Sequence, residues 1–197
     1  MINFKNKKIA VVCNDAGGAE LIASWAKEKK LKFFAKLSGP AVKIFKYKKL
    51  NFKKINSLSD IKKMNIIITG TGWASNKEIE AIVAAKKYKK KIISFLDHWK
   101  NYKSRFFYKN KYFYPTEIWV MDKHAEKNAK KIFNNLIIRR IKNPYLIYLK
   151  KKRKKLKNNK FLIVTNNLDK AKSEMKEKIG LSDKDFIYKT LKFIKKN

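Results

Sequence analysis

The sequence predicts an α/β domain over residues 1–143, in which a Rossmann-like, doubly wound parallel sheet carries helices on both faces. Short runs rich in β-branched residues alternate with amphipathic helical patterns, as in chains built from βαβ units. The clearest run, residues 65–69 (NIIIT), is largely apolar, which is typical of a parallel strand buried on both faces. Right-handed connections between such strands then place helices on both sides of the sheet.

The first half of this domain holds four predicted strands, at residues 8–14 (KIAVVCN), 31–37, 52–55 and 65–69. Between them, apolar residues recur at helical spacing in residues 19–30 and in a short piece that Pro40 opens. Ser57 and Asp60 resemble an N-cap pair for a third helical segment, which continues to Met64.

The second half continues the alternation. Ser75 and Glu78 fit a capping box, in which the serine hydroxyl accepts from the Glu78 amide and the carboxylate accepts from the Ser75 amide. The helix that they start is expected to run to about Tyr88. The remaining predicted elements are strands at 91–96 (KIISFL), 117–121 (EIWVM) and 136–141, and a helix that buries Ala125, Ala129, Ile132 and Phe133.

The pattern breaks at Asn143-Pro144-Tyr145. Residues 144–160 are predicted to be a basic linker or crossing segment, and residues 161–197 the start of an incomplete second α/β domain or a docking segment. This last part contains a predicted strand at 161–166 and two helical patterns, at 170–179 and after a Ser182 cap. A single strand cannot form a sheet alone, so we expect it to dock or to await further residues.

The net charge of +36 invites a nucleic-acid interpretation. However, the basic residues are 47 lysines and only 4 arginines, spread along the whole chain, whereas sites that read phosphates or bases favour arginine. Lysine, asparagine, isoleucine, phenylalanine and tyrosine are all abundant, and A/T-rich codons specify these residues. We therefore favour a compositional origin, although nonspecific attraction to polyanions at low salt is still expected. The aromatic loop at 106–114 is expected to pack as a lid or subunit contact, with base stacking as the alternative.

Cysteine and histidine are scarce. Cys13 is the only cysteine, so no intrachain disulfide forms, and a reducing cytoplasm is the natural location. It lies in an apolar run and is expected in the core, and with two histidines in the chain no metal site is predicted. No apolar run approaches the ~18 residues of a membrane span.

Four polar loops follow predicted strands, where open parallel sheets bind ligands. The first contains Asp15, Gly17 and Gly18. Glycines here let a phosphate or a sugar hydroxyl approach the helix amides, and a tight turn capped by Asp15 is an equally good interpretation. It is neither a dinucleotide fingerprint nor a Walker loop.

The second loop contains Thr71, Gly72 and Trp73, a candidate cradle for a sugar or an anion. The alternative is a turn over which Trp73 packs. The third and fourth loops contain the remaining candidates, which are Asp97, His98, Arg105 and His124. A carboxylate next to an imidazole at a strand end is a candidate acid/base pair, Arg105 is a candidate for an anionic substrate group, and Asp122 is expected to cap the helix that carries His124.

Five segments carry a family resemblance: the glycine loop, the GTGW motif, FLDHWKNYKSRF, PTEIWVMDKHAEKNAKKIF and the NPY crossing. Together they resemble the amino-terminal half of GT-B type glycosyltransferase-like proteins of bacterial polysaccharide biosynthesis. Those proteins are similar in fold to UDP-N-acetylglucosamine 2-epimerases. The resemblance covers about residues 8–145. It implies that this half offers the acceptor side of a cleft, that a second half binds a nucleotide-sugar donor such as a UDP-sugar, and that no other cofactor is needed. It further implies that His98 is the general base, beside Asp97, and that Arg105 assists an anionic group.

The chain departs from this pattern because no donor-binding glycine loop follows residue 160. We therefore expect an incomplete enzyme, with no nucleotide-sugar turnover alone, which associates with itself or with a missing second half. The alternatives are a UDP-sugar epimerase-like or hydrolase-like half, a lysine-rich nucleic-acid-binding protein, and a non-catalytic, truncated partner subunit.

Overall fold

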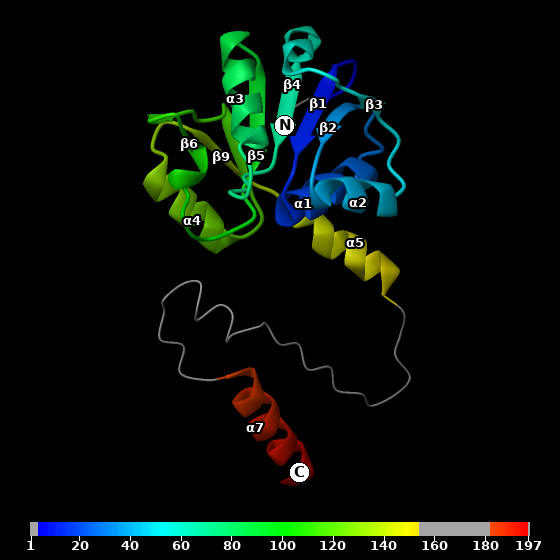
Figure 1. The fold of residues 1–197 in the computed structure, drawn as a ribbon, viewed down its shortest axis with the longest axis vertical. Coiled ribbons are helices and arrows are strands. Elements are labelled where there is room, and N and C mark those ends of the chain that lie inside the picture. The colour runs from blue at the N-terminus through cyan, green and yellow to red at the C-terminus, as the bar shows by residue number, and fades with distance from the viewer. Residues whose placement is uncertain (1–3, 154–181, 197) are drawn as a thin grey trace. The chain divides into compact units, whose positions relative to one another are not determined.

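The computed structural model of the chain describes residues 4–153 and 182–196 (Figure 1). Seven strands form one sheet in the order β3-β2-β1-β4-β5-β8-β9, and every neighbouring pair is parallel. They are β1 (Ile9–Cys13), β2 (Phe34–Leu37), β3 (Lys53–Lys54), β4 (Ile66–Thr69), β5 (Lys91–Phe95), β8 (Glu117–Val120) and β9 (Ile137–Arg140). A separate antiparallel hairpin consists of β6 (Phe107–Tyr108) and β7 (Lys111–Tyr112). The predicted Rossmann-like α/β fold is therefore confirmed.

The helices are α1 (Ala16–Glu28), α2 (Pro40–Tyr47), α3 (Lys77–Lys87), α4 (Lys123–Ile132), α5 (Pro144–Lys152) and α7 (Asp183–Lys196), with 3-10 helices η1 (Leu58–Lys63) and η2 (Ser104–Phe106). The chain adds β2 and β3 on one side of β1, then returns to add β4 on the other side. The strand order therefore reverses between β1 and β4, and in sheets of this type ligands bind beyond the strand ends at such a point.

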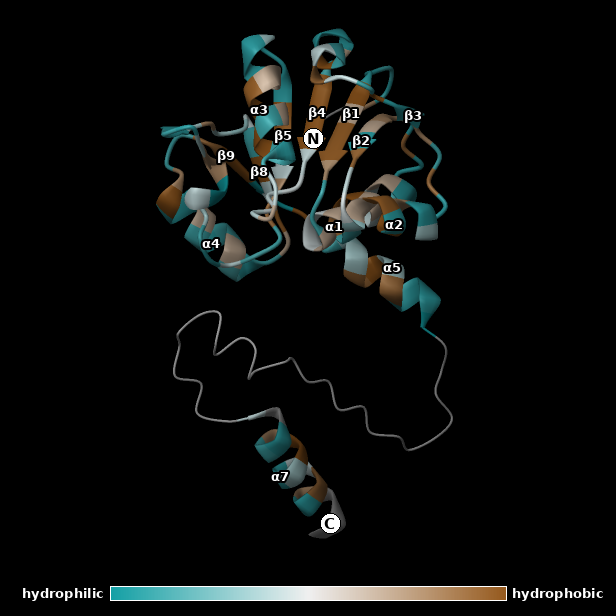
Figure 2. Ribbon diagram, viewed as in Figure 1, coloured by the Kyte–Doolittle hydropathy of each residue, from teal (hydrophilic) through white to brown (hydrophobic). Residues whose placement is uncertain are grey.

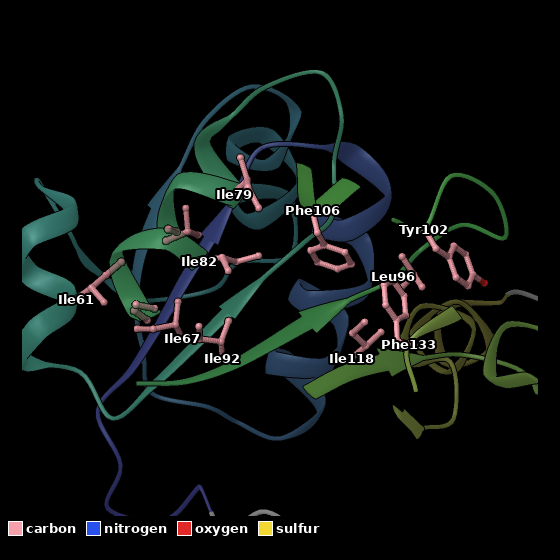
Figure 3. Packing of buried hydrophobic residues seen from close by; sticks show 14 of the residues in the cluster. Ile61, Ile67, Ile79, Ile82, Ile92, Leu96, Tyr102, Phe106, Ile118 and Phe133 are labelled. Atoms are coloured by element: carbon pink, nitrogen blue, oxygen red, sulfur yellow. The ribbon is translucent and has the colours of Figure 1, made fainter. Parts of the chain in front are cut away.

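Alternate residues of the central strands pack into two separate hydrophobic layers. Ala10 and Val12 of β1 lie in a layer with α3, whereas Ile9 and Val11 lie in a layer with α1 and α2. Figure 3 shows part of the first layer, in which isoleucines of η1, β4, α3 and β5 belong to the same cluster as the ring of Phe106. Because both faces are covered, β1 and β4 are buried along their whole length, and all their residues except Thr69 are hydrophobic (Figure 2).

Among the predicted helix caps of the domain, the one at the start of α3 is wrong. Ser57 and Asp60 form the expected capping box at the start of η1. At the start of α3, however, Asn76 is the N-cap residue and makes no capping hydrogen bond through its side chain. The buried hydroxyl of Ser75 has no hydrogen-bond partner, and the carboxylate of Glu78 accepts from the amides of two loops at the edge of the sheet.

Beyond β9, α5 packs against α1, and the chain divides into compact units at residues 1–153 and 154–197. In the second unit, α7 begins with the predicted cap, since Ser182 and Asp185 exchange hydrogen bonds between side chain and backbone. The strand predicted at 161–166 and the helix predicted at 170–179 lie outside the described residues. Within the described ranges, no helix combines the length and the apolar composition that crossing a membrane requires.

Candidate functional site

The loops after β1, β4, β5 and β8 gather at one edge of the sheet, because parallel strands all end on the same side (Figure 1). Each of the four polar loops predicted from the sequence follows one of these strands. Their side chains interlock through three sets of contacts, around Glu78, around Asp97 and around Trp99.

Glu78 ties the loop after β1 to the loop after β4. Its carboxylate is almost fully buried (2% exposed) and accepts a hydrogen bond from the Asn14 amide at 3.0 Å and another from the Gly72 amide at 2.6 Å. Burial raises the pKa of Glu78, and the hydrogen bonds from the two amides oppose this effect. Gly72 is needed for this approach, since a Cβ at that position would lie 2.5 Å from the Cβ of Asp15.

Asp97 and Arg105 tie the loop after β5 to its two neighbours. Arg105 donates to the Thr71 carbonyl at 2.5 Å and lies 3.5 Å from the Asp97 carboxylate. The side chains of both residues are largely buried, and burial raises the pKa of Asp97, partly offset by Arg105. A Cβ at Gly17 would lie only 2.0 Å from Asp97 Oδ2, so the first turn of α1 touches this carboxylate directly. Asp97 thus compensates the charge of Arg105, and Arg105 connects the loop after β5 to the loop after β4.

Trp99 and Asp122 form the third set. The indole Nε1–H of Trp99 donates to Asp122 Oδ2 at 3.0 Å, while Oδ1 accepts from the Ala125 amide at 2.7 Å, so Asp122 caps α4 as predicted. Although burial alone would raise the pKa of Asp122, these hydrogen bonds lower it. His124 packs edge-on against Trp99, with ring centres 6.0 Å apart. The indole ring is therefore held by its edge, yet it is 61% exposed.

These loops and α1 border a pocket of about 420 Å³, whose polar and aromatic lining comprises Glu20, Asp97, His98, Trp99, Asp122, Asn143 and Tyr145. Of the candidates proposed from the sequence, Gly17, Asp97 and His98 line it. The others do not line it: Asp15, Thr71, Gly72 and Trp73 lie in the loops, Gly18 in α1, Arg105 in η2 and His124 in α4. Glu20 was missed although it follows Gly17 by one helical turn, a spacing that places both on one face of α1.

His98 is exposed and its ring is already oriented. Nδ1 accepts a hydrogen bond from the Lys100 amide at 3.2 Å. In a neutral imidazole the proton then resides on Nε2, which makes this atom a donor toward a ligand oxygen. The general-base role expected for His98 would require Nδ1 to release the Lys100 amide, whereas Asp97 lines the pocket with its carboxylate.

Cys13 lies in β1, fully buried, as predicted. Burial, followed by the charge of Glu78, raises the pKa of its thiol, so the thiol stays protonated and is a poor nucleophile. Across the described parts of the chain, no group of three or more histidine, cysteine, aspartate or glutamate side chains is arranged to hold a metal ion.

No protein-family model matches the chain, and no curated protein sequence matches it significantly. Among solved structures, a de novo designed Rossmann 2x3 fold protein, determined by solution NMR, aligns with 78% of this chain and 96% of the designed one, at 10% sequence identity and a TM-score of 0.29. The fold assignment therefore rests on the strand order and pairing of the chain itself, and its function has to be argued from the site.

Proposed function

We propose that the domain binds a sugar at the carboxyl-terminal edge of its sheet, as the acceptor-side half of a GT-B type glycosyltransferase-like protein. The observation that carries this proposal is that Asp97, His98 and Trp99, three consecutive residues after β5, line one pocket together with Gly17 of α1. The pocket volume of about 420 Å³ lies within the range that small-molecule sites occupy.

The three residues provide complementary contacts for a sugar ring. The exposed face of Trp99 offers an apolar surface to the C–H groups of the ring, and its edge is fixed by Asp122. His98 presents an N–H to a ring oxygen or hydroxyl. Asp97, desolvated next to Gly17, accepts a hydrogen bond from an acceptor hydroxyl and takes its proton during transfer.

In GT-B type proteins one half offers the acceptor side of the cleft and the other half binds the donor. The residues that line this pocket favour the acceptor side. A nucleotide-sugar donor carries a diphosphate, which proteins bind with arginine, lysine or helix amides. Although the first turn of α1 borders this pocket, the described residues that line it include three carboxylates and no lysine or arginine, and the nearby Arg105 is paired with Asp97. The proposal therefore assigns the donor to a separate, second half.

An NMR titration of the 197-residue chain tests this proposal. Glucose, as a simple probe, should shift the indole N–H resonance of Trp99, which the Trp99→Phe variant identifies. The resonance of Trp73, which is 83% exposed and does not line the pocket, should stay unchanged and serves as the control. If glucose at saturating concentrations shifts neither Trp99 nor the amides of Asp97 and His98, the sugar-binding proposal is wrong.

The charge of +36 favours one rival function, nucleic-acid binding. A titration with RNA at increasing salt separates the two. Counterion release weakens attraction by scattered lysines steeply, so nonspecific binding should disappear near ~0.2 M salt. Binding to one RNA sequence or structure that persists there would instead support the rival.

A further inference from the structure

The pocket at the strand ends differs in charge from the rest of the chain. Lysine makes up 47 of the 197 residues, so about three lysines would be expected among the fourteen residues that line the pocket. None of these fourteen, all within the described part of the chain, is a lysine or an arginine. Three other cavities of similar size are lined by three, four and four lysines. The lysine bias of the chain therefore extends to these three cavities but not to the pocket at the strand ends.

Carboxylates gather where lysine is missing. Glu20, Asp97 and Asp122 line the pocket. Asp15 and Glu78 lie close behind it, since the charge of Asp15 contributes to raising the pKa of both Glu78 and Asp97. Five of the 15 acidic residues of the chain thus lie at this edge of the sheet.

Two cations, Lys48 and Arg105, form ion pairs with lining carboxylates, but neither lines the pocket. Lys48 pairs with Glu20 at 2.7 Å, its side chain is 1% exposed, and its ammonium lies 3.7 Å from the ring centre of Tyr148. The Arg105 side chain is 7% exposed, because it is packed between Thr71 and Asp97. Neither can swing out toward a phosphate without breaking these contacts.

We propose that this pocket accepts a ring compound that carries an ammonium group, and excludes phosphorylated ligands. The inference rests on the proposed function and narrows its substrate class to an amino sugar. Asp122 is the anchor for the ammonium, because its hydrogen-bond donors, the indole N–H of Trp99 and the amides of Ala125 and His124, are all neutral. The indole face adds a cation–π contribution. A phosphate in the same place would instead meet the three lining carboxylates.

Four probes test the charge and the sugar separately: glucosamine, glucose, glucose 6-phosphate and cyclohexylamine. Each is titrated at near-physiological salt and slightly acidic pH, with the Trp99 indole N–H as the NMR readout. We expect glucosamine to bind about tenfold more tightly than glucose, as a cation–π contact with a charge-assisted hydrogen bond provides. Cyclohexylamine should bind detectably, and glucose 6-phosphate should leave Trp99 unchanged.

Asp122→Asn is the matched variant, since asparagine still caps α4 but removes the charge. Its NH₂ group replaces one acceptor oxygen, so it should also weaken the Trp99 hydrogen bond and lower the affinity for both sugars. The readout of the charge is the ratio of the two affinities, and the preference for glucosamine over glucose should disappear. Asp60→Asn changes a residue of the capping box of η1, away from the lining residues. It should change neither the affinity for glucose nor the preference for glucosamine.

The outcomes separate the two proposals. Equal binding of glucosamine and glucose, or tighter binding of glucose 6-phosphate at Trp99, overturns the charge assignment and leaves the sugar site standing. Binding of cyclohexylamine without either neutral or amino sugar overturns the sugar function and keeps the cationic pocket. If no probe shifts Trp99, both are wrong.

Discussion

Replacing Glu78 with glutamine should destabilise the domain, because no neutral side chain can satisfy both amides that this carboxylate binds. The amides of Asn14 and Gly72 point at different oxygens of Glu78, at 3.0 and 2.6 Å. Glutamine offers one oxygen and one NH₂ group, so one buried amide keeps its acceptor and the other faces a donor.

The magnitude follows from these contacts. A buried N–H left without an acceptor costs about 1–3 kcal/mol, and the hydrogen bond that remains loses about 1 kcal/mol when its acceptor is no longer charged. Part of this loss is returned, since the buried carboxylate, whose pKa is raised by burial, no longer has to be desolvated. We expect a net loss of about 2 kcal/mol, which lowers Tm by roughly 4–8 °C for a domain of this size.

Urea denaturation followed by tryptophan fluorescence measures this loss. The Glu28→Gln variant is a suitable control, because Glu28 makes only a long contact of 3.9 Å with Lys29 at the surface, and such changes stay within about ±0.5 kcal/mol. Unchanged stability of Glu78→Gln would refute the conclusion that this carboxylate joins the two loops. In the variant, the amides of residues 14 and 72 should also exchange faster with solvent, whereas α4 should keep its protection.

Three further predictions concern other parts of the site and the core. Gly17→Ala should weaken ligand binding, because its Cβ would lie 2.0 Å from Asp97 Oδ2 and push the carboxylate out of place; calorimetric titration that detects unchanged affinity would contradict this. Glu117→Gln should make the free energy of unfolding decrease less steeply as the pH is lowered. Although burial alone would raise it, the pKa of Glu117 is lowered by bonds from Lys91, Trp119 and Arg139, so its contribution is present above the ordinary value of 4.5 and disappears as the pH falls through the folded-state pKa. Cys13 should react with a thiol reagent at the rate of unfolding only, since its side chain is fully buried; rapid labelling of the native protein would be the contrary result.

The fold was predictable because strands that are buried on both faces of a sheet have a recognisable sequence pattern. The residues of β1, β4 and most of β5 are buried at every position, which produces continuous apolar runs that only parallel, covered strands require. The edge strand β3 has two residues, both exposed lysines, and is correspondingly weak as a sequence pattern. The four polar loops were located correctly because each follows one of the predicted strands.

The contacts among these loops were not predictable in the same way. Ser75 and Glu78 match a capping box, but a carboxylate at that position of a helix can equally reach a loop from elsewhere in the chain. Here it binds the amide of Asn14, 64 residues away. Likewise, the residues alone do not reveal that the Lys100 amide occupies His98 Nδ1. Local patterns identify candidate groups, whereas long-range packing decides which atom of each group faces the ligand.

The high lysine content of the chain makes a pocket without lysine informative. In an ordinary protein, a pocket without lysine has no special meaning, because lysine is expected at few of its positions. Here lysine occupies about a quarter of all positions and lines the other three cavities, yet it is missing from the fourteen described residues around the strand ends. A compositional drift toward lysine explains the charge of the surface, but it predicts the opposite at this pocket. A requirement of the pocket itself must therefore exclude lysine, and a bound ammonium group, which lysine would repel and replace beside Asp122, provides one.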